Sequence, residues 1–196
     1  MKTIVCFGDS NTWGYVPGSE AERFPPDVRW PARLAAALAG DAEVVAEGLN
    51  GRRATIDSPA VEGRNGLPYL VPCLHSHAPV DLLVIYLGTN DAYWLDADVV
   101  AQSVGRLVKV ARAAEAGPGF GAPQVLVVCP PPFDGYELGA AFKQVCDVLG
   151  CELLDLDGIV TYSELDAIHL EEMGHVAVAA AIEARVRPML DLVRPR

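Results

Sequence analysis

The sequence lacks any long run of apolar residues, since the longest, Val176 to Ile182, has only seven. A helix that crosses a bilayer needs about 20. The segment from Met1 to Gly8 also lacks the extended apolar stretch and the small-residue cleavage site of a secretory leader. We therefore expect no membrane span, no membrane partner and a cytoplasmic location.

Basic residues are scarce. Lys and Arg number 15 against 26 Asp and Glu, which gives a formal net charge of −11 at pH 7. The imbalance is even along the chain, −6 in residues 1–98 and −5 in residues 99–196. A surface of this sign repels phosphate backbones, so nucleic acid is not expected as a partner.

Cysteine and histidine give no sign of a metal centre. The five cysteines form no Cys-x-x-Cys pair and most have apolar neighbours, which favours buried, reduced thiols. Hydrolytic metal sites use several histidine and carboxylate ligands at fixed spacing, whereas this chain has four histidines in all. A metal phosphoesterase built on Asp9, Asp91 and His169 is therefore disfavoured, and no metal or other cofactor is expected.

The length of 196 residues predicts one domain, residues 1–196. Five short apolar runs predict strands, namely Thr3–Phe7, Glu43–Ala46, Leu82–Leu87, Val125–Cys129 and Glu152–Leu154. Apolar residues at three- and four-residue spacing predict helices at Trp30–Ala39, Gly66–His77, Asp96–Ala116, Ala140–Leu149 and Glu171–Leu192. This alternation predicts a three-layer α/β/α fold around a flavodoxin-like, five-stranded parallel sheet of order 2-1-3-4-5.

Polar residues follow several of the predicted strands. Ligands in such sheets collect at the carboxyl ends of the strands, where the sequence places Gly8-Asp9-Ser10, Gly48 and Gly88-Thr89-Asn90-Asp91. Asp166 and His169 precede the last predicted helix. A serine hydroxyl becomes a useful nucleophile when a base takes its proton and a third group orients that base. Ser10, His169 and Asp166 suit these three roles.

Attack on an ester also creates an oxyanion, which needs hydrogen-bond donors fixed in advance. The main-chain N–H groups of Ser10 and Gly48 and the side-chain amide of Asn90 are the candidates. Asp155, Asp157 and Glu171 remain alternative partners for the imidazole of His169. Asp9 and Asp91 are interpreted as structural, because carboxylates in turns commonly accept hydrogen bonds from nearby main-chain N–H groups.

These residues resemble the GDSL (SGNH) hydrolase family. Its four blocks are matched in family order by Gly8-Asp9-Ser10, by Gly48, by Gly88-Thr89-Asn90-Asp91, and by Asp166 with His169. The resemblance implies the SGNH hydrolase fold without a cofactor. It also implies Ser10 as nucleophile, His169 as base with Asp166 orienting it, and an oxyanion hole from Ser10, Gly48 and Asn90.

Further motifs resemble the bacterial arylesterase and acyltransferase branch of that family. They are Thr12-Trp13-Gly14, Arg23-Phe24, Asp27-Val28-Arg29-Trp30, Glu47-Gly48-Leu49 and Pro130-Pro131-Pro132. Three features depart from the pattern: Asn11 replaces leucine, Ala167 replaces a common glycine, and the stretch 132–142 is shorter. Members of the branch act on small esters, and some transfer the acyl group to other acceptors.

The sequence therefore predicts a serine esterase that hydrolyses small carboxylic esters through an acyl-enzyme. Asn11, Trp13 and Tyr15 are candidate substrate-binding residues, although Trp13 and Tyr15 equally suit packing beneath the first loop. The alternatives are an acyltransferase or carbohydrate deacetylase with the same site, and a non-catalytic, flavodoxin-like ligand-binding module. An exposed Tyr93-Trp94-Leu95 segment would be a natural contact in a homo-oligomer.

Overall fold

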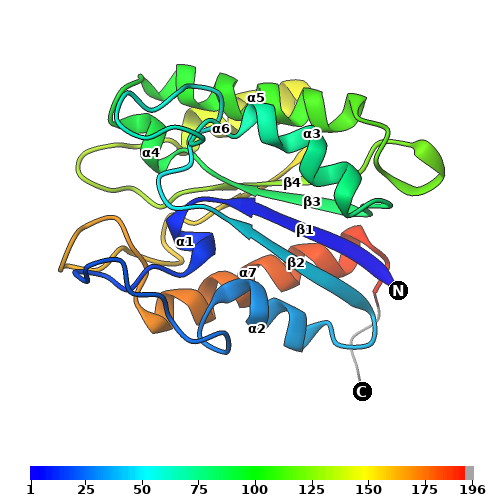
Figure 1. Cartoon of the computed structure of the whole chain (residues 1–196), viewed down its shortest axis with the longest axis horizontal. Helices are drawn as coiled ribbons and strands as arrows, with labels where there is room; N and C mark the ends of the chain where they lie inside the picture. The colour runs from blue at the N-terminus through cyan, green and yellow to red at the C-terminus, as the bar shows by residue number, and fades with distance from the viewer. Residues whose placement is uncertain (193–196) are drawn as a thin grey trace.

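The computed structural model describes residues 1–192, in which five parallel strands form one sheet of order β2-β1-β3-β4-β5 (Figure 1). The strands are β1 (Lys2–Gly8), β2 (Ala42–Gly48), β3 (Leu82–Tyr86), β4 (Gln124–Cys129) and β5 (Glu152–Asp155). All neighbouring pairs are parallel. The predicted strand order is thus confirmed.

Helices cover both faces of this sheet (Figure 1). They are α1 (Ser10–Trp13), α2 (Trp30–Ala37), α3 (Leu67–Ser76), α4 (Thr89–Ala92), α5 (Ala97–Ala113), α6 (Gly139–Leu149) and α7 (Glu172–Met189), with a short 3₁₀ turn, η1 (Pro118–Phe120). Helices α2 and α7 pack on one face, and α3, α5 and α6 on the other. The α/β fold and its three layers match the prediction.

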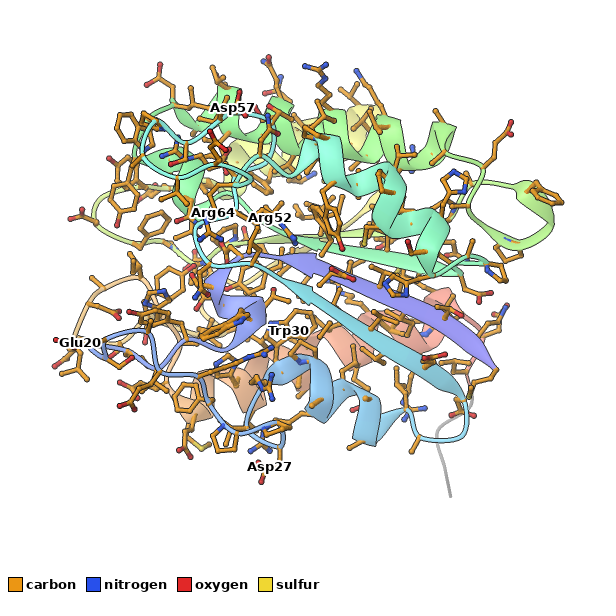
Figure 2. The ribbon with its side chains drawn as sticks, viewed as in Figure 1. Glu20, Asp27, Trp30, Arg52, Asp57 and Arg64 are labelled. Carbon is orange, nitrogen blue, oxygen red and sulfur yellow. The ribbon has the colours of Figure 1, made fainter. Side chains whose placement is uncertain are left out.

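Alternating residues of the strands supply two separate cores. Val5 and Phe7 of β1 face the core beneath α3, α5 and α6, whereas Ile4 and Cys6 face the core beneath α2 and α7. Such a sheet has no polar face, because both faces are covered. In Figure 2, Trp30 lies between the sheet and α2 and belongs to this second core.

The elements differ from expectation mainly at their ends. The helix expected over residues 96–116 ends at Ala113, and the short helices α1 and α4 were not predicted. A helix of four residues is too short for an apolar period to appear in the sequence. The last four residues of the expected domain, 193–196, lie outside the described part. Within residues 1–192, no helix combines the length and apolar character needed to cross a membrane.

Candidate active site

Three of the predicted side chains form one hydrogen-bonded chain at the carboxyl end of the sheet. Ser10 opens α1 directly after β1, and its Oγ lies 3.0 Å from Nε2 of His169. The other ring nitrogen, Nδ1, lies 2.8 Å from Oδ2 of Asp166. Ser10 is 7% exposed and His169 8% exposed. The arrangement allows the imidazole to take a proton from the hydroxyl while the carboxylate orients the ring.

Asp166 is held in its ionised form by several donors. Burial raises the pKa of this carboxyl, but the hydrogen bonds from His169 and from main-chain N–H groups outweigh burial and hold the pKa below its ordinary value. Main-chain N–H groups of Gly18, Ile168 and His169 all donate to this carboxylate. A carboxylate fixed in this way is suited to orienting a histidine.

Two of the three alternative carboxylates have other partners. Asp155 accepts a hydrogen bond from the main chain of Asp157, and Glu171 accepts one from the hydroxyl of Ser163. Both ring nitrogens of His169 are already engaged, by Asp166 and by Ser10. The geometry therefore favours Asp166 over Asp155, Asp157 and Glu171.

Asn11 holds the loop that carries His169. Its Nδ2 donates to the carbonyl of Ile168 at 3.0 Å, and its Oδ1 accepts from the N–H of Leu170, also at 3.0 Å. The side chain is 2% exposed. This placement differs from the substrate contact expected for Asn11, since the amide is occupied by main-chain groups on both sides of the histidine.

The two aromatic candidates lie in the segment after Ser10. The ring of Tyr15 stacks on the imidazole of His169, with centroids 4.2 Å apart and planes 17° apart. The ring centroid of Trp13 lies 6.3 Å from that of Tyr15, and the guanidinium of Arg23 lies over the Trp13 ring. Tyr15 therefore packs against the imidazole of the candidate site. Substrate contacts of Trp13 and Tyr15 stay predictions.

The candidate oxyanion donors lie at or just after strands that end at the same level of the sheet. Gly8 of β1 pairs with Gly48 of β2 on one side and with Tyr86 of β3 on the other, so the strands that lead to Ser10, Gly48 and Asn90 end side by side. Gly48 approaches α1 closely, because a β-carbon there would lie 2.2 Å from the main-chain nitrogen of Trp13. Only glycine fits without displacing that helix.

The amide of Asn90 is tethered in the free protein. Its Nδ2 donates to the carbonyl of Arg52 at 3.2 Å and to Oδ2 of Asp9 at 3.4 Å. Both hydrogen bonds are long, as polar contacts in unliganded active sites often are. Both N–H bonds of the amide are thus engaged in the free protein, and donation to an oxyanion requires that one of these two long hydrogen bonds be exchanged.

Asp9 and Asp91 are fully enclosed beneath the site. Asp9 caps α1 by accepting from the N–H of Asn11, and both oxygens of Asp91 accept from the N–H of Ala54. Burial raises the pKa of Asp9 to about 7 and that of Asp91 to about 6, despite these hydrogen bonds. Their contacts match the structural interpretation given to them.

Arg52 was not singled out by any sequence motif. Its guanidinium donates to the main-chain carbonyls of Gly8 and Glu47 and lies 4.1 Å from the ring centroid of Phe7. Its own carbonyl holds Asn90, and Figure 2 marks the side chain beside the sheet. An isolated arginine in a loop carries no pattern, so only its neighbours in space reveal this role.

Comparison with known proteins places the chain among esterases. The model of the GDSL-like Lipase/Acylhydrolase family matches residues 6–177. The solved structure of an aryl esterase from M. smegmatis has 35% sequence identity to this chain and a TM-score of 0.90. A carbohydrate acetylesterase from Sinorhizobium meliloti has 31% identity and a TM-score of 0.89. A putative arylesterase from Agrobacterium tumefaciens has 33% identity and a TM-score of 0.88. Each match covers 96% of this chain and 100% of the other. None of the curated proteins compared with the chain matches it significantly.

Proposed function

The chain belongs to the GDSL-like lipase/acylhydrolase family and is an ester-hydrolysing enzyme, and on this premise we propose that Ser10, His169 and Asp166 form its catalytic triad. The observation that carries the proposal is the continuous chain of hydrogen bonds from Asp166 through His169 to Ser10, at 2.8 and 3.0 Å. A binding module without turnover has no need of such a chain. One catalytic domain, residues 1–196, is part of the proposal.

In the first half of the reaction, Ser10 Oγ attacks the ester carbonyl while Nε2 of His169 takes the hydroxyl proton. The C–O bond to the alcohol then breaks, and the imidazolium returns the proton to the leaving alcohol. Asp166 stabilises the imidazolium, which agrees with the lowered pKa of its carboxyl. The product of this half is an ester between the acyl group and Ser10.

In the second half, water replaces the alcohol. His169 takes a proton from the water, which attacks the acyl-enzyme, and Ser10 leaves as a free hydroxyl. Both halves pass through an oxyanion that accepts hydrogen bonds from the N–H groups of Ser10 and Gly48 and from the Asn90 amide. Support for this trio comes from the common level at which their strands end.

The proposed substrates are small carboxylic esters. Two relatives support this proposal, since one is named an aryl esterase and the other a carbohydrate acetylesterase, whose acyl group is the short acetyl group. The second of these relatives also favours sugar deacetylation as a second candidate activity at the same site. Acyl transfer to an alcohol remains an alternative fate of the acyl-enzyme, and product partition in the presence of a competing alcohol distinguishes it from hydrolysis.

Replacement of the nucleophile tests the proposal. Ser10→Ala is expected to lower kcat for p-nitrophenyl acetate by roughly three or more orders of magnitude, since only binding and the oxyanion donors would remain. Ser76→Ala is the matched control, because Ser76 is an exposed serine on α3 whose hydroxyl bonds only to its own helix. A fluorophosphonate probe should label the wild type and not Ser10→Ala. Undiminished turnover in Ser10→Ala contradicts the proposal.

A further inference from the structure

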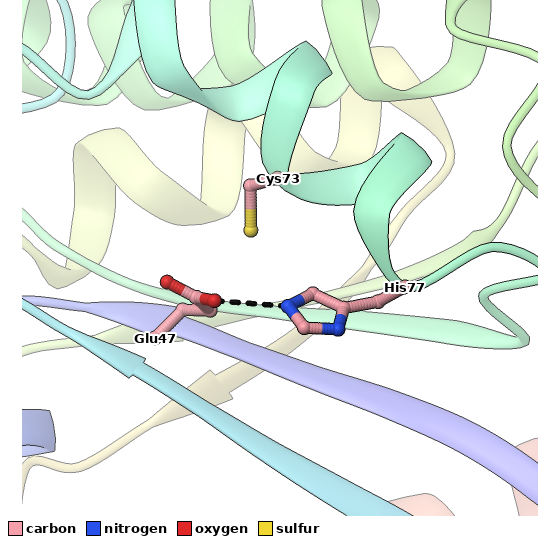
Figure 3. Close-up of side chains that lie close together, drawn as sticks. All are labelled: Glu47, Cys73 and His77. Atoms are coloured by element: carbon pink, nitrogen blue, oxygen red, sulfur yellow. Dashed lines mark hydrogen bonds and ion pairs between the residues drawn. The ribbon is translucent and has the colours of Figure 1, made fainter.

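Away from the triad, three side chains able to ligate a metal ion converge between the edge strand β2 and helix α3. Glu47 is the next-to-last residue of β2, Cys73 lies within α3, and His77 directly follows it. One ligand atom from each lies within 4.8 Å of the other two. Figure 3 shows the Cys73 sulfur pointing toward the space between the carboxylate and the imidazole.

The local structure explains this convergence. Cys73 and His77 are four residues apart, so they share one face of the helix. Glu47 lies on the same face of β2 as Val45, which packs against the core beneath α3. The sheet therefore presents the carboxylate to the helix face that carries the thiol and the imidazole.

The carboxylate is oriented by a neighbouring tyrosine. The hydroxyl of Tyr69 donates to Oε2 of Glu47 at 3.1 Å, while Oε1 lies 2.9 Å from Nε2 of His77. One oxygen is thus held from outside the cluster, and the other faces the imidazole. Outer partners of this kind fix the ligands of metal sites.

We propose that Glu47, Cys73 and His77 form a binding site for one divalent transition-metal ion, with zinc the best match. A thiolate, an imidazole and one carboxylate oxygen are typical zinc ligands, whereas magnesium and calcium require mostly oxygen. Tetrahedral zinc with bond lengths of about 2.0–2.3 Å needs ligand atoms roughly 3.3–3.5 Å apart. The three ligand atoms, which lie within 4.8 Å of one another, would have to adjust to that spacing as the ion binds.

Access to solvent supplies the fourth ligand position. Cys73 is buried, whereas the side chains of Glu47 and His77 are 19% and 29% exposed. An ion bound between these two side chains would replace their mutual hydrogen bond and keep one water on the exposed side. Zinc binding forms a Zn–S bond and releases the thiol proton to solvent, because burial and the charge of Glu47 keep Cys73 protonated in the free protein, with a pKa of about 12.

The proposed ion would join the sheet edge to α3 beside the candidate active site. Glu47 immediately precedes Gly48, which approaches α1 through its main chain. The site is distinct from the triad, since the hydrolytic mechanism uses none of the three ligands. The experiment that tests this site therefore measures metal binding and not ester turnover.

Cobalt(II) is a suitable probe, because thiolate coordination gives an intense near-ultraviolet charge-transfer absorption. The reduced, metal-free protein is expected to bind one equivalent of Co²⁺ with this absorption, and Zn²⁺ should displace it. Cys73→Ser should abolish the absorption, and His77→Gln and Glu47→Gln should each weaken Co²⁺ binding at least tenfold. Circular dichroism verifies that each variant folds.

Two matched variants guard against incidental binding. Cys151→Ser removes the partly exposed cysteine outside the cluster, and His75→Gln removes an exposed histidine from the same helix. Both should bind Co²⁺ as the wild type does. The proposal is overturned if the wild type shows no thiolate absorption, or if the absorption is lost in Cys151→Ser and kept in Cys73→Ser. The cluster is then only a hydrogen-bonded pair, Glu47 with His77, beside a buried thiol.

Discussion

At the scale of single residues, the site depends on side chains that hold the reacting groups as much as on those groups themselves. Asn11 bridges the main chain on both sides of His169, and Tyr15 stacks on its ring. Ala167, in the same loop, has a left-handed φ of 61°. A residue other than glycine costs about 1–2 kcal/mol there, which explains why the resembling family commonly has glycine.

Asn11→Ala tests the positioning of the base. The substitution removes the partner of the buried N–H of Leu170 and that of the partly buried carbonyl of Ile168. The free energy of unfolding should fall by about 1–3 kcal/mol for the buried N–H and by less for the carbonyl. Displacement of His169 should lower kcat on the order of 10²-fold with little change in KM. Urea unfolding and steady-state kinetics measure the two effects.

Asn65→Ala is the control for this variant, because Asn65 is a loop residue whose side chain also bonds main-chain groups, those of Thr55 and Leu67, neither of which belongs to the triad. It is expected to leave kcat unchanged. If Asn11→Ala raises KM and keeps kcat, Asn11 instead contacts the substrate, as the sequence suggested.

At the scale of secondary-structure elements, the sequence predicted all five strands and the five long helices to within a few residues. Strands as uniformly apolar as β3 and the strong three- and four-residue spacing of α5 left little ambiguity. The short helices α1 and α4 were missed, although each carries a candidate site residue, Ser10 in α1 and Asn90 in α4. They form where strands end at the site, and their residues show no apolar period.

The packing of α7 on α2 makes stability depend on pH. His175 of α7 is fully buried, accepts a hydrogen bond from the N–H of Trp30, and meets the ring of Phe24 edge-on. Burial, with Arg33 and Arg29 nearby, lowers its pKa from 6.5 to about 4. As pH falls from 6.5 to 4, the unfolded chain binds a proton that the folded chain does not. The stability contributed by the neutral, buried His175 is therefore fully present above pH 6.5 and is lost as pH falls through this window.

His175→Gln should remove this dependence. Between pH 7 and pH 4, the wild type should lose about 3 kcal/mol more of its free energy of unfolding than the variant does. Urea unfolding at several pH values measures the free energy of unfolding of both proteins. Asp9 and Asp91 are present in both, so their contributions cancel when the variant is subtracted from the wild type. His75→Gln, at an exposed position, should keep the wild-type slope. Equal slopes in wild type and His175→Gln would contradict the assignment.

At the scale of the whole molecule, the formal charge of −11 is spread over the chain and sets the long-range field. This field repels anionic substrates on approach, and salt screens it over about 10 Å at 0.1 M. The exposed Tyr93 and Trp94, with Trp94 60% accessible, suit the contact between copies suggested by the sequence. That contact stays a prediction.

The charge predicts opposite behaviour for neutral and anionic esters. For an acetate ester whose leaving group carries a carboxylate, kcat/KM should rise several-fold as NaCl is raised from low to moderate concentration. The neutral ester of the same size should respond little. Stopped-flow or steady-state assays measure how kcat/KM of each ester depends on the NaCl concentration. A fall in kcat/KM for the anionic ester would show that arginines near the site, such as Arg23, outweigh the overall charge.

Local patterns in the sequence were enough to predict the sheet, its strand order and the positions of the four family blocks, because apolar periodicity and strand-end motifs are local properties of the chain. The sequence also predicted the pairing of Asp166 with His169, because the two residues are only three positions apart in one loop and can therefore contact each other locally. Three contacts could be seen only in the folded chain: Asn11 with the histidine loop, Arg52 with Asn90, and Glu47 with Cys73 and His77. These contacts join segments distant in sequence, and their existence depends on how the packed elements orient each side chain in space.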